Sequence, residues 1–575
     1  MAALDAGGYN SRVSNSSSAR KPDAYFLLGA VCFLAAVIWC GRSAMMRGLE
    51  YDEVYTMLHY AAADSWRGIF NDLAIPNNHP LHSLLVRWSV ELTGAGELAV
   101  RLPALIAMAA TWLLVPLLAF HLTNDRVIAF LATVWALTSA PLLHYAEASR
   151  GYALQTFLVV LFAWFVLRAN RGDSIQGRRL GWAVIVGLAA ILTLPTSVIF
   201  IAPIGLYDLT RRYLDWRKVD LPTKFFSAER RALVAYAILA LMGGMWLWRG
   251  ASQFAQGRQT FGTPIESFDT WTTFVGEVTS QIWGWPLVVL IAAGLLMTRD
   301  WRLSLFLVLT LIFPFLVAPL TRGGGARVYL ALAPFGFIAA AIAVSRAMEV
   351  LVSNLKLRSA IVVLLALVPL LWMPRSLKHW TSPDWRAAAK EICRVAPADG
   401  YIVYPATDGL VLQFYGRKEY QSDVVNRVPL GDEFTLVIAG NNGRLSGIVP
   451  KTMQSDDVEL TKTGATSRVL GVPLWTVRAR RVTERNPNDN VVFVAIGPDR
   501  RDAVRARIKE MLTANSSAQW VVLNGLLSDA LMDFPQVDDK TAVLLVGWPG
   551  KLADGDWKKL AAHSGTPIRF YSSQP

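Results

Sequence analysis

The sequence predicts a polytopic α-helical membrane protein of about eleven transmembrane helices, followed by a soluble α/β domain at its C-terminal end. Composition supports this fold class, because 53% of the 575 residues are hydrophobic and 17% are charged, whereas soluble domains average about 45–50% apolar and about 25% charged residues. Distribution supports it as well, because long apolar segments stop near residue 375. We therefore divide the chain into a cytoplasmic tail (1–23), a transmembrane domain (24–375) and a C-terminal domain (376–575).

Each predicted span is a mostly apolar segment that approaches the roughly 20 residues needed to cross a bilayer. The segments are 24–40, 102–122, 127–145, 153–167, 180–209, 233–248, 283–298, 303–320, 328–344 and 360–372. Segment 180–209 is longer than one span and is divided by Pro195 and Pro203, so we expect two short helices that meet near residues 193–196. The first segment lacks a small-residue cleavage site, so we expect no cleavable signal peptide.

Loop charge predicts the orientation, because cytoplasmic loops carry an excess of Lys and Arg. Basic loops alternate correctly if the N-terminus is cytoplasmic, and they lie at 168–179, 211–231, 299–302 and 346–358. The outward segments are then 43–101, 146–152, 249–281, 321–327 and everything after residue 374. An odd number of spans places the C-terminal domain on the same outer side as the first loop.

The net charge of +13 belongs mainly to these loops, so we expect no nucleic-acid partner. The three cysteines form no disulfide framework, since Cys32 and Cys40 lie in an apolar segment and Cys393 lies alone in a polar region.

The C-terminal domain contains short apolar runs that are typical of strands. They are 401–404, 435–439, 491–496, 520–523 and 542–546, with helix-like stretches at 501–512 and 556–563. Apolar strands alternating with helices favour a mostly parallel sheet. No Gly-rich phosphate loop follows a strand, so a nucleotide-binding role has no support.

The first outward loop carries three carboxylates, Glu50, Asp52 and Glu53, just beyond the end of the first span. Carboxylates near a membrane surface are costly unless they are solvated or used. One of them is therefore either part of a solvated turn or a general base aimed at an acceptor hydroxyl.

The same loop continues to His79 and His82, which are three residues apart before an apolar helical pattern. Two histidines are a weak metal site, and the alternative is that one or both of them pack or cap the helix. In the second outward loop, Glu147 and Arg150 either pair with each other or bind a metal, a sugar hydroxyl or a phosphate.

A Gly-rich loop lies between Arg322 and Arg327, and Tyr329 follows it. Glycines allow a ligand to approach the backbone closely, and guanidinium groups bind phosphate in a bidentate manner. The loop is therefore either a phosphate-binding segment or a flexible connector with interfacial arginines.

As an ordered set, these motifs resemble the GT-C superfamily of integral-membrane glycosyltransferases over roughly residues 25–375. The matching residues are Asp52-Glu53, Asn78-His79-Pro80-Leu81, Glu97, Arg101-Leu102-Pro103, Tyr145–Tyr152 and Arg327-Val328-Tyr329 through Pro334. The nearest likeness is to bacterial relatives of protein O-mannosyltransferases, lipid A aminoarabinose transferases and lipopolysaccharide-core galacturonosyltransferases. Many relatives have two prolines where this chain has His79-Pro80, which puts the acceptor contacts in doubt.

The resemblance implies inverting transfer of a monosaccharide from a polyprenyl-phosphate donor to a hydroxyl of a glycolipid, polysaccharide or protein on the outer face of the bacterial inner membrane. It implies Asp52 as the base, with Glu53 positioning Asp52 or the acceptor. Arg150, Arg322 and Arg327 would bind the donor phosphate, and His79, His82, Glu147 and Tyr329 would contact the acceptor or substrate. A divalent metal stays open, with Glu147 as its ligand.

Two other functions remain compatible with the sequence. One is a membrane transporter, although transporters place ionisable residues inside their spans. The other is a non-catalytic membrane partner of a cell-envelope assembly complex, with the C-terminal domain as its docking module.

Overall fold

The computed structural model describes residues 24–62, 66–71, 73, 78–169, 175–217, 229–255, 265–321, 325–371, 373, 386, 414–415 and ten strands after residue 400. The predicted tail (1–23), Arg322, Cys393 and the helix-like stretches 501–512 and 556–563 lie outside the described residues.

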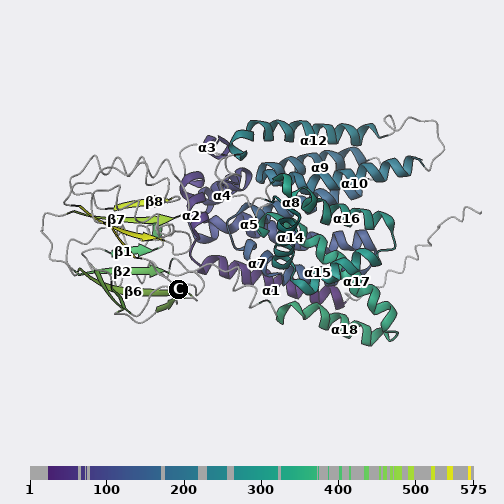
Figure 1. Ribbon diagram of the computed structural model, residues 1–575. Helices are drawn as coiled ribbons and strands as arrows, with labels where there is room; N and C mark the ends of the chain where they lie inside the picture. Colours follow the sequence, from purple (N-terminus) through teal and green to yellow (C-terminus); the bar gives the residue numbers. More distant parts are fainter. Residues whose placement is uncertain are drawn as a thin grey trace, which may run out of the picture.

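The described part of the membrane domain is a helical bundle (Figure 1). Its longer helices are α1 (Ala24–Met46), α5 (Glu97–Thr123), α6 (Arg126–Leu137), α8 (Gly151–Arg168), α9 (Gln176–Thr193), α10 (Val198–Arg217), α12 (Arg230–Arg249), α14 (Phe268–Ile282), α15 (Trp285–Met297), α16 (Trp301–Leu316), α17 (Ala333–Leu351) and α18 (Leu355–Leu367). Shorter elements are α2 (Tyr51–Thr56), a π-helical turn (Met57–Ala61), α3 (Arg67–Asn71), α4 (Pro80–Thr93), α7 (Ala140–Ala146) and 3₁₀ turns at Pro195–Ser197, Ala318–Thr321 and Ala326–Leu332.

A multi-pass membrane protein is confirmed, but the count of eleven spans is not. Among the described residues, six helices are long and apolar enough to cross a bilayer, or eight if the bent pairs α6–α7 and α14–α15 each count as one span. The other three predicted segments coincide with α9, α10 and α18. Arginines open α9, charged residues fill the second half of α10, and α18 has only 13 residues.

The predicted break near residues 193–196 is present. Leu194 is extended between α9 and the turn Pro195–Ser197, from which α10 starts. Pro203 lies inside α10 and does not interrupt it. A proline within a membrane helix is tolerated when neighbouring groups satisfy the freed backbone.

Helix α14 differs from the prediction, which placed its residues in an outward loop. Ser267 caps the helix, with its Oγ accepting a hydrogen bond from the Thr270 backbone N–H at 3.1 Å. The bend of 102° to α15 leaves α14 out of line with a span. Its many threonines hid the helical pattern from a search for apolar runs.

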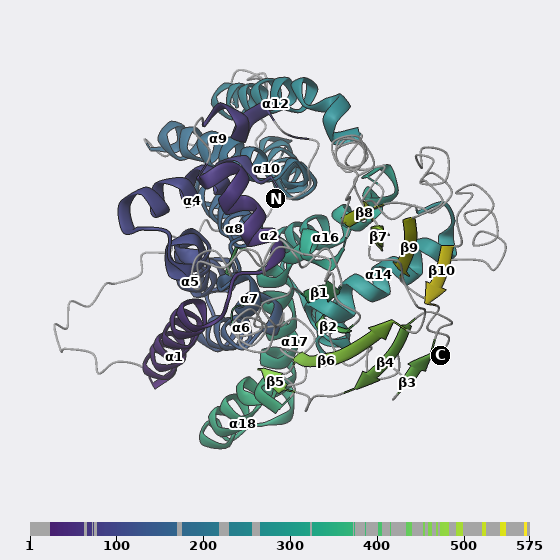
Figure 2. The ribbon, with the colours of Figure 1, turned by 90° about the vertical axis from the view of Figure 1, so that its left-hand side faces the viewer.

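Helix α17 is the centre of the bundle, because 94% of its span is buried inside the protein. Helix α15 crosses it closely at Gly294, where a Cβ atom would lie 1.8 Å from the Ala339 carbonyl oxygen. By contrast, α12 lies at the edge of the bundle beside α9 and α10 (Figure 2), and 22% of its span is buried.

The described strands after residue 400 form two sheets beyond the end of the bundle at which α2 lies (Figure 1). The strands are β1 (Tyr401–Tyr404), β2 (Glu433–Ala439), β3 (Thr452–Gln454), β4 (Val458–Lys462), β5 (Ser467–Val469), β6 (Val472–Arg481), β7 (Asn490–Gly497), β8 (Trp520–Asn524), β9 (Thr541–Gly547) and β10 (Ile568–Tyr571). The first sheet has the order β1-β2-β6-β4-β3, with β5 also on β6, and the second has the order β10-β9-β7-β8.

All five predicted strand segments coincide with strands, but a mostly parallel sheet is found only in part. The second sheet is parallel throughout, and its strands β7, β8 and β9 are continuous apolar runs. In the first sheet only β1 and β2 pair in parallel. There only the second half of β6 alternates, with Val477 and Ala479 between Thr476, Arg478 and Arg480, a pattern typical of antiparallel strands.

Candidate active site

The carboxylate of Glu53 is held in place by four hydrogen bonds and anchors the first outward loop. Its carboxylate accepts hydrogen bonds from Arg101 Nε at 2.9 Å, from Arg101 Nη2 at 2.6 Å, from the Ser149 N–H at 2.6 Å and from the Glu50 N–H at 2.8 Å. The side chain is fully buried. Burial alone would raise the pKa of Glu53, but the charge and hydrogen bonds of Arg101 and the two backbone N–H groups hold that pKa below its ordinary value.

Arg101, in the first turns of α5, extends this anchor to the end of α1. Its guanidinium also donates to the carbonyl oxygens of Ala44 at 3.1 Å, Arg47 at 2.8 Å and Gly48 at 2.8 Å. A buried charge pair is stable only when its remaining hydrogen-bonding positions are filled, and here they are. The Glu53–Arg101 pair therefore sets the path of the chain into α2.

Asp52 precedes Glu53 by one residue and points elsewhere. It forms an ion pair with Nη1 of Arg150, and its side chain is 32% exposed, whereas that of Arg150 is largely buried. Arg150 stands immediately before α8, so the ion pair joins the first outward loop to the second. Of the two adjacent carboxylates, Asp52 is the one that solvent or a substrate can reach.

Two arginines converge on Tyr152. The guanidinium carbon of Arg150 lies 5.5 Å from the centre of the Tyr152 ring, and Arg327 also hydrogen-bonds with Tyr152. Burial lowers the pKa of Arg150, and the nearby positive charge of Arg327 acts in the same direction. Arg327 stands at the start of the turn Ala326–Leu332 and is exposed, so this pair of cations has one accessible side.

His79 lies beneath these groups. Its ring centre is 5.2 Å from that of Tyr152, and a Cβ on Gly151 would come within 2.8 Å of its side chain, so only glycine fits there. His79 is buried, and among the described residues neither ring nitrogen has a hydrogen-bond partner. Burial, the positive charge that His82 can carry and the charge of Arg327 lower its pKa to about 3, so the ring is neutral at pH 7.

His82 is one turn further along, inside α4. Its Nε2 lies 3.4 Å from Ser149 Oγ. Burial lowers its pKa to about 4, although the hydrogen bond with Ser149 and the charge of Glu53 act in the opposite direction. Both histidines are therefore uncharged, and neither can attract a phosphate by charge.

Besides the pairs Glu53–Arg101 and Asp52–Arg150, the site has a third salt-bridge cluster, which contains Glu147. Arg47 bridges it, at 3.4 Å, to Glu50, also at 3.4 Å. Burial raises the pKa of Glu147, and the charge of Arg47 offsets part of that rise. With Glu147 held by Arg47 and Asp52 held by Arg150, and with no cluster of three or more His, Cys, Asp or Glu ligands among the described residues, these side chains do not fit a divalent metal.

Tyr415 reaches the site from beyond the bundle. Its hydroxyl accepts a hydrogen bond from the Leu49 N–H at 2.6 Å and donates one to Glu97 Oε1 at 3.2 Å. The Tyr415 side chain is fully buried. No local sequence pattern predicts these two contacts, because 318 residues separate Tyr415 from Glu97. Tyr415 therefore fixes the backbone just before the acidic loop.

Tyr329 was predicted to contact substrate and lies in an aromatic cluster instead of at the open side. Its buried ring stacks on Phe315 at 5.3 Å and meets the edges of Phe200 and Phe274 at 6.2 and 5.5 Å. Packing explains this position. Substrate contact by Tyr329 stays a prediction.

Solved structures with a similar arrangement were found in a comparison with this chain. ArnT from Cupriavidus metallidurans in the apo state is 14% identical with a TM-score of 0.45, over 78% of this chain and 98% of that one. The same protein bound to undecaprenyl phosphate is 16% identical with a TM-score of 0.42, over 78% and 97%. The Archaeoglobus fulgidus oligosaccharyltransferase in complex with Zn and sulfate is 14% identical with a TM-score of 0.43, over 68% and 61%.

No protein-family model matches this chain, and no curated protein sequence does.

The motifs that carry the GT-C resemblance in the sequence meet in space. Asp52, Arg150 and Arg327 come together around Tyr152, and His79 lies beside the same ring. The positions of Arg101 and Ser149 around Glu53 were not predicted, although both residues lie within the quoted motifs. Tyr415 was missed entirely.

Proposed function

We propose that the chain is a bacterial inner-membrane glycosyltransferase that moves a monosaccharide from a polyprenyl-phosphate donor to a hydroxyl acceptor on the outer face. The observation that carries this proposal is the convergence of Arg150 and Arg327 on Tyr152, directly beside the partly exposed carboxylate of Asp52. A phosphate-binding pair of cations next to an accessible base is what a transfer from a sugar phosphate to a hydroxyl requires.

The charges of the site leave room for an anion. Three arginines are already matched by carboxylates, in the groups Glu53–Arg101, Asp52–Arg150 and Glu50–Arg47–Glu147. Arg327 has no carboxylate in these groups. A donor phosphodiester carries one negative charge, so Arg327 would bind it first, and Arg150 would join when the phosphate draws it from Asp52.

This exchange gives the Asp52–Arg150 ion pair a role in the reaction. When the phosphate takes over Arg150, the Asp52 carboxylate is left beside the donor without its counter-ion and becomes a better proton acceptor. The acceptor oxygen then forms a bond to the anomeric carbon as the bond from that carbon to the phosphate oxygen breaks. The hydroxyl proton passes to Asp52, and the electron pair leaves with the polyprenyl phosphate, whose second negative charge the two arginines stabilise.

Attack opposite the leaving phosphate inverts the anomeric centre. Glu53 takes no part in proton transfer, because all its hydrogen bonds are to Arg101, Ser149 and Glu50 and it is buried. We assign it to positioning, since it holds the loop from which Asp52 projects.

The unpartnered ring nitrogens of His79 lie next to Tyr152 and suit a neutral hydrogen bond to a sugar or acceptor hydroxyl. Glu147 and His82 act indirectly in this proposal. They support the second outward loop and do not themselves contact the sugar or the acceptor. The acceptor is a glycolipid such as lipopolysaccharide, a polysaccharide or a protein, and the C-terminal domain faces the periplasm together with the acidic loop.

Complementation of a deletion strain tests the function. Mass spectrometry of envelope glycolipids, polysaccharides and proteins should show the loss of one monosaccharide residue from one class. The wild-type gene should restore it. Asp52→Asn should reduce turnover by about 10²-fold or more while its protein level stays normal. The matched control Asp269→Asn, in the exposed first turn of α14, should restore the missing monosaccharide as fully as the wild-type gene does.

A donor test separates this proposal from other glycosyl transfers. Purified protein with membranes of the deletion strain as acceptor should use a polyprenyl-phosphate sugar. Transfer from a nucleotide sugar in lipid-depleted reactions would show that the donor assignment is wrong, and full activity of Asp52→Asn would remove this residue from the chemistry.

A further inference from the structure

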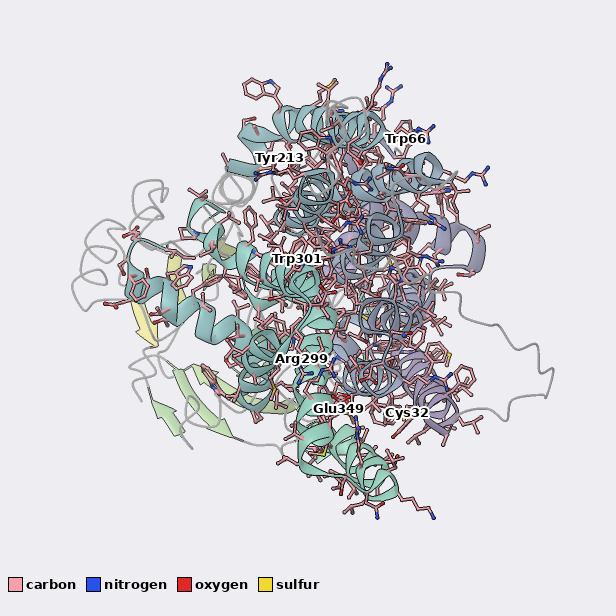
Figure 3. All side chains as sticks on the ribbon, turned by 90° about the vertical axis from the view of Figure 1, so that its right-hand side faces the viewer. Cys32, Trp66, Tyr213, Arg299, Trp301 and Glu349 are labelled. Carbon is pink, nitrogen blue, oxygen red and sulfur yellow. The ribbon has the colours of Figure 1, made fainter. Side chains whose placement is uncertain are left out.

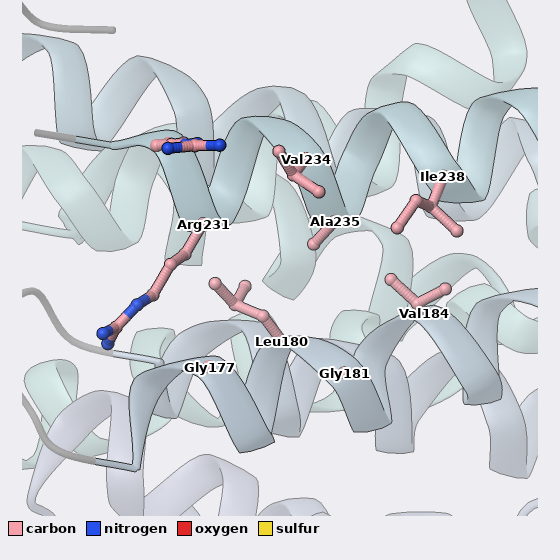
Figure 4. Close-up of a pocket in the computed structure, with 9 residues that line it drawn as sticks. Gly177, Leu180, Gly181, Val184, Arg231, Val234, Ala235 and Ile238 are labelled. Atoms are coloured by element: carbon pink, nitrogen blue, oxygen red, sulfur yellow. The ribbon is translucent and has the colours of Figure 1, made fainter. Parts of the chain in front are cut away.

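A groove of about 670 Å³ lies between α9 and α12, at the end of both helices that is remote from the candidate active site. Figure 4 shows its walls, with Gly177, Leu180, Gly181 and Val184 on one helix and Arg231, Val234, Ala235 and Ile238 on the other. Thr193, at the other end of α9, packs near Gly151 in the active site. The middle of the groove, at Leu180, lies 13 residues from Thr193 along α9, and at a rise of about 1.5 Å per residue the groove and the site are separated by roughly 20 Å.

The two helices are in contact along their length, and beside the packed residues Leu180, Ala232 and Ala235 they leave a groove. A Cβ on Gly187 would lie 3.0 Å from Leu239 Cδ1, and a Cβ on Gly243 would lie 2.8 Å from Ile191 Cδ1. At Gly181, by contrast, a Cβ would meet nothing within 4 Å. Glycines spaced four apart on a membrane helix normally let a partner helix approach closely, yet the space at Gly181 stays open, and at Gly177 a Cβ would meet the stem of Arg231.

The opening is apolar, with Leu180 and Ala235 buried and the side chains on the α12 rim uncovered. Val234 and Ile238 expose 48% and 43% of their surface, and both lie on the edge helix α12 (Figure 2). A groove of this kind on the rim of a membrane bundle faces lipid tails, so an acyl chain can enter it from the side.

Two arginines stand at the mouth. Arg230 and Arg231 open α12 and are exposed, and the stem of Arg231 lies against α9, with its Cδ 3.8 Å from the position of a Cβ on Gly177. Among the described residues neither arginine has a carboxylate partner. The nearby acids, Asp208 and Glu229, are buried and already bound to Arg211 and Arg212.

We propose that the groove binds one anionic phospholipid of the bilayer, with its phosphate at Arg230 and Arg231 and one acyl chain along the floor formed by Gly177, Gly181 and Ala235. Arginine forks bind phosphate in a bidentate manner, and each basic residue at the membrane surface strengthens the attraction of an anionic headgroup. Charge therefore selects the headgroup, and the opening between the helices selects an acyl chain. This site is independent of the proposed catalytic function.

Native mass spectrometry of the detergent-purified full chain measures binding directly. We expect phosphatidylglycerol to bind more tightly than phosphatidylcholine with the same acyl chains. The double variant Arg230→Gln/Arg231→Gln should weaken phosphatidylglycerol binding by about tenfold or more and leave phosphatidylcholine binding unchanged.

The matched control is Arg217→Gln/Arg299→Gln, which removes two exposed arginines from the same end of the bundle without touching the groove. Arg217 ends α10, and Arg299, labelled in Figure 3, precedes α16, whose Arg302 pairs with Asp215 of α10. This control should keep the affinity for phosphatidylglycerol within about twofold. An equal loss in both double variants would overturn the proposal, because it would show a general surface charge effect.

A third variant tests the acyl chain. Gly181→Leu fills open space, so the protein should keep its melting temperature while both phospholipids bind less tightly. If it does not fold, Ile238→Trp fills the groove from the opposite wall. Unchanged binding of both lipids in the folded variant would overturn the placement of the chain between α9 and α12.

Discussion

Two clusters of arginines and carboxylates lie at opposite ends of the bundle, and they differ in one respect. At the end remote from the sheets, Arg212 binds Asp208 at 2.7 Å and Glu229 at 2.8 Å and also donates to the Ala169 carbonyl oxygen. Arg211 and the Tyr236 hydroxyl bind the same aspartate at 2.8 and 2.9 Å. Two acids face two bases, and both acids are buried.

The cluster near α2 uses the same residue types but is not closed. Glu53 and Arg101 form a buried pair like those of the remote cluster, whereas Asp52 is partly exposed and Arg327 stands outside any carboxylate pair of the site. A closed cluster secures the fold, and an open one can exchange a protein partner for a ligand. Exposure and unmatched charge, more than the presence of charged residues, separate the two roles.

The largest effect is expected from opening the closed cluster. Arg212→Gln leaves Glu229 and part of Asp208 without a buried counter-ion, so it should cost about 3–5 kcal/mol of stability, seen as a lower melting temperature in detergent. Arg211→Gln should cost about 1 kcal/mol or less, because Arg212 and Tyr236 stay on Asp208. Equal stability of Arg212→Gln and wild type would refute the view that this cluster secures the fold.

Opening the other cluster should affect the reaction before it affects the fold. Arg150→Gln and Arg327→Gln should each raise the barrier by about 2–4 kcal/mol, as removal of a donor to a developing anion does. Their melting temperatures should change little, because Asp52 and Arg327 are accessible to water. Initial rates with the polyprenyl-phosphate donor test this, with Arg168→Gln, at the far end of α8, as the control. A large loss of stability without a specific loss of rate would place these arginines with the closed cluster.

The neutral histidines beneath the open cluster predict a pH effect. The pKa values of His79 and His82 are lowered to about 3 and about 4, so below the ordinary value of about 6.5 the unfolded chain binds protons that the folded chain does not. Stability should therefore be full above pH 6.5 and fall toward pH 4, by about 1.4 kcal/mol per pH unit for each histidine. His82→Asn should remove the contribution of one histidine to this loss of stability, so its melting temperature should fall less steeply than that of the wild type between pH 7.5 and pH 5. An unchanged slope would mean that His82 titrates normally.

The smallest effect concerns the support of the acidic loop from outside the bundle. Tyr415→Phe leaves the buried Leu49 N–H without its acceptor, which should cost about 1–2 kcal/mol and lower kcat more than it changes KM. Tyr213→Phe, an exposed position at the remote end, should change neither. If both variants behave alike, Tyr415 only fills space.

The sequence predicted the helices of the bundle because each needs an apolar run, and it predicted the break at Pro195 because proline leaves a local mark. Helix α14 escaped because threonines replace apolar residues in it. Among the candidate site residues, the acidic loop and the arginines of the later loops were proposed by residue type, and the structure brings Asp52, Arg150 and Arg327 together. The adjacent residues Asp52 and Glu53 give no indication of which carboxylate is buried. Burial of Glu53 depends on its pairing with Arg101, which is 48 residues away. Tyr415 is beyond such reasoning, because its partners Leu49 and Glu97 lie 366 and 318 residues away in the sequence.

The ion pair between Asp52 and Arg150 also has a consequence for the order in which substrates add. Before the donor arrives, the partly exposed carboxylate of Asp52 is neutralised by Arg150, so a bound acceptor or a stray water molecule meets no competent base there. The proposed exchange therefore makes the route compulsory, with the lipid-linked sugar first and the acceptor second.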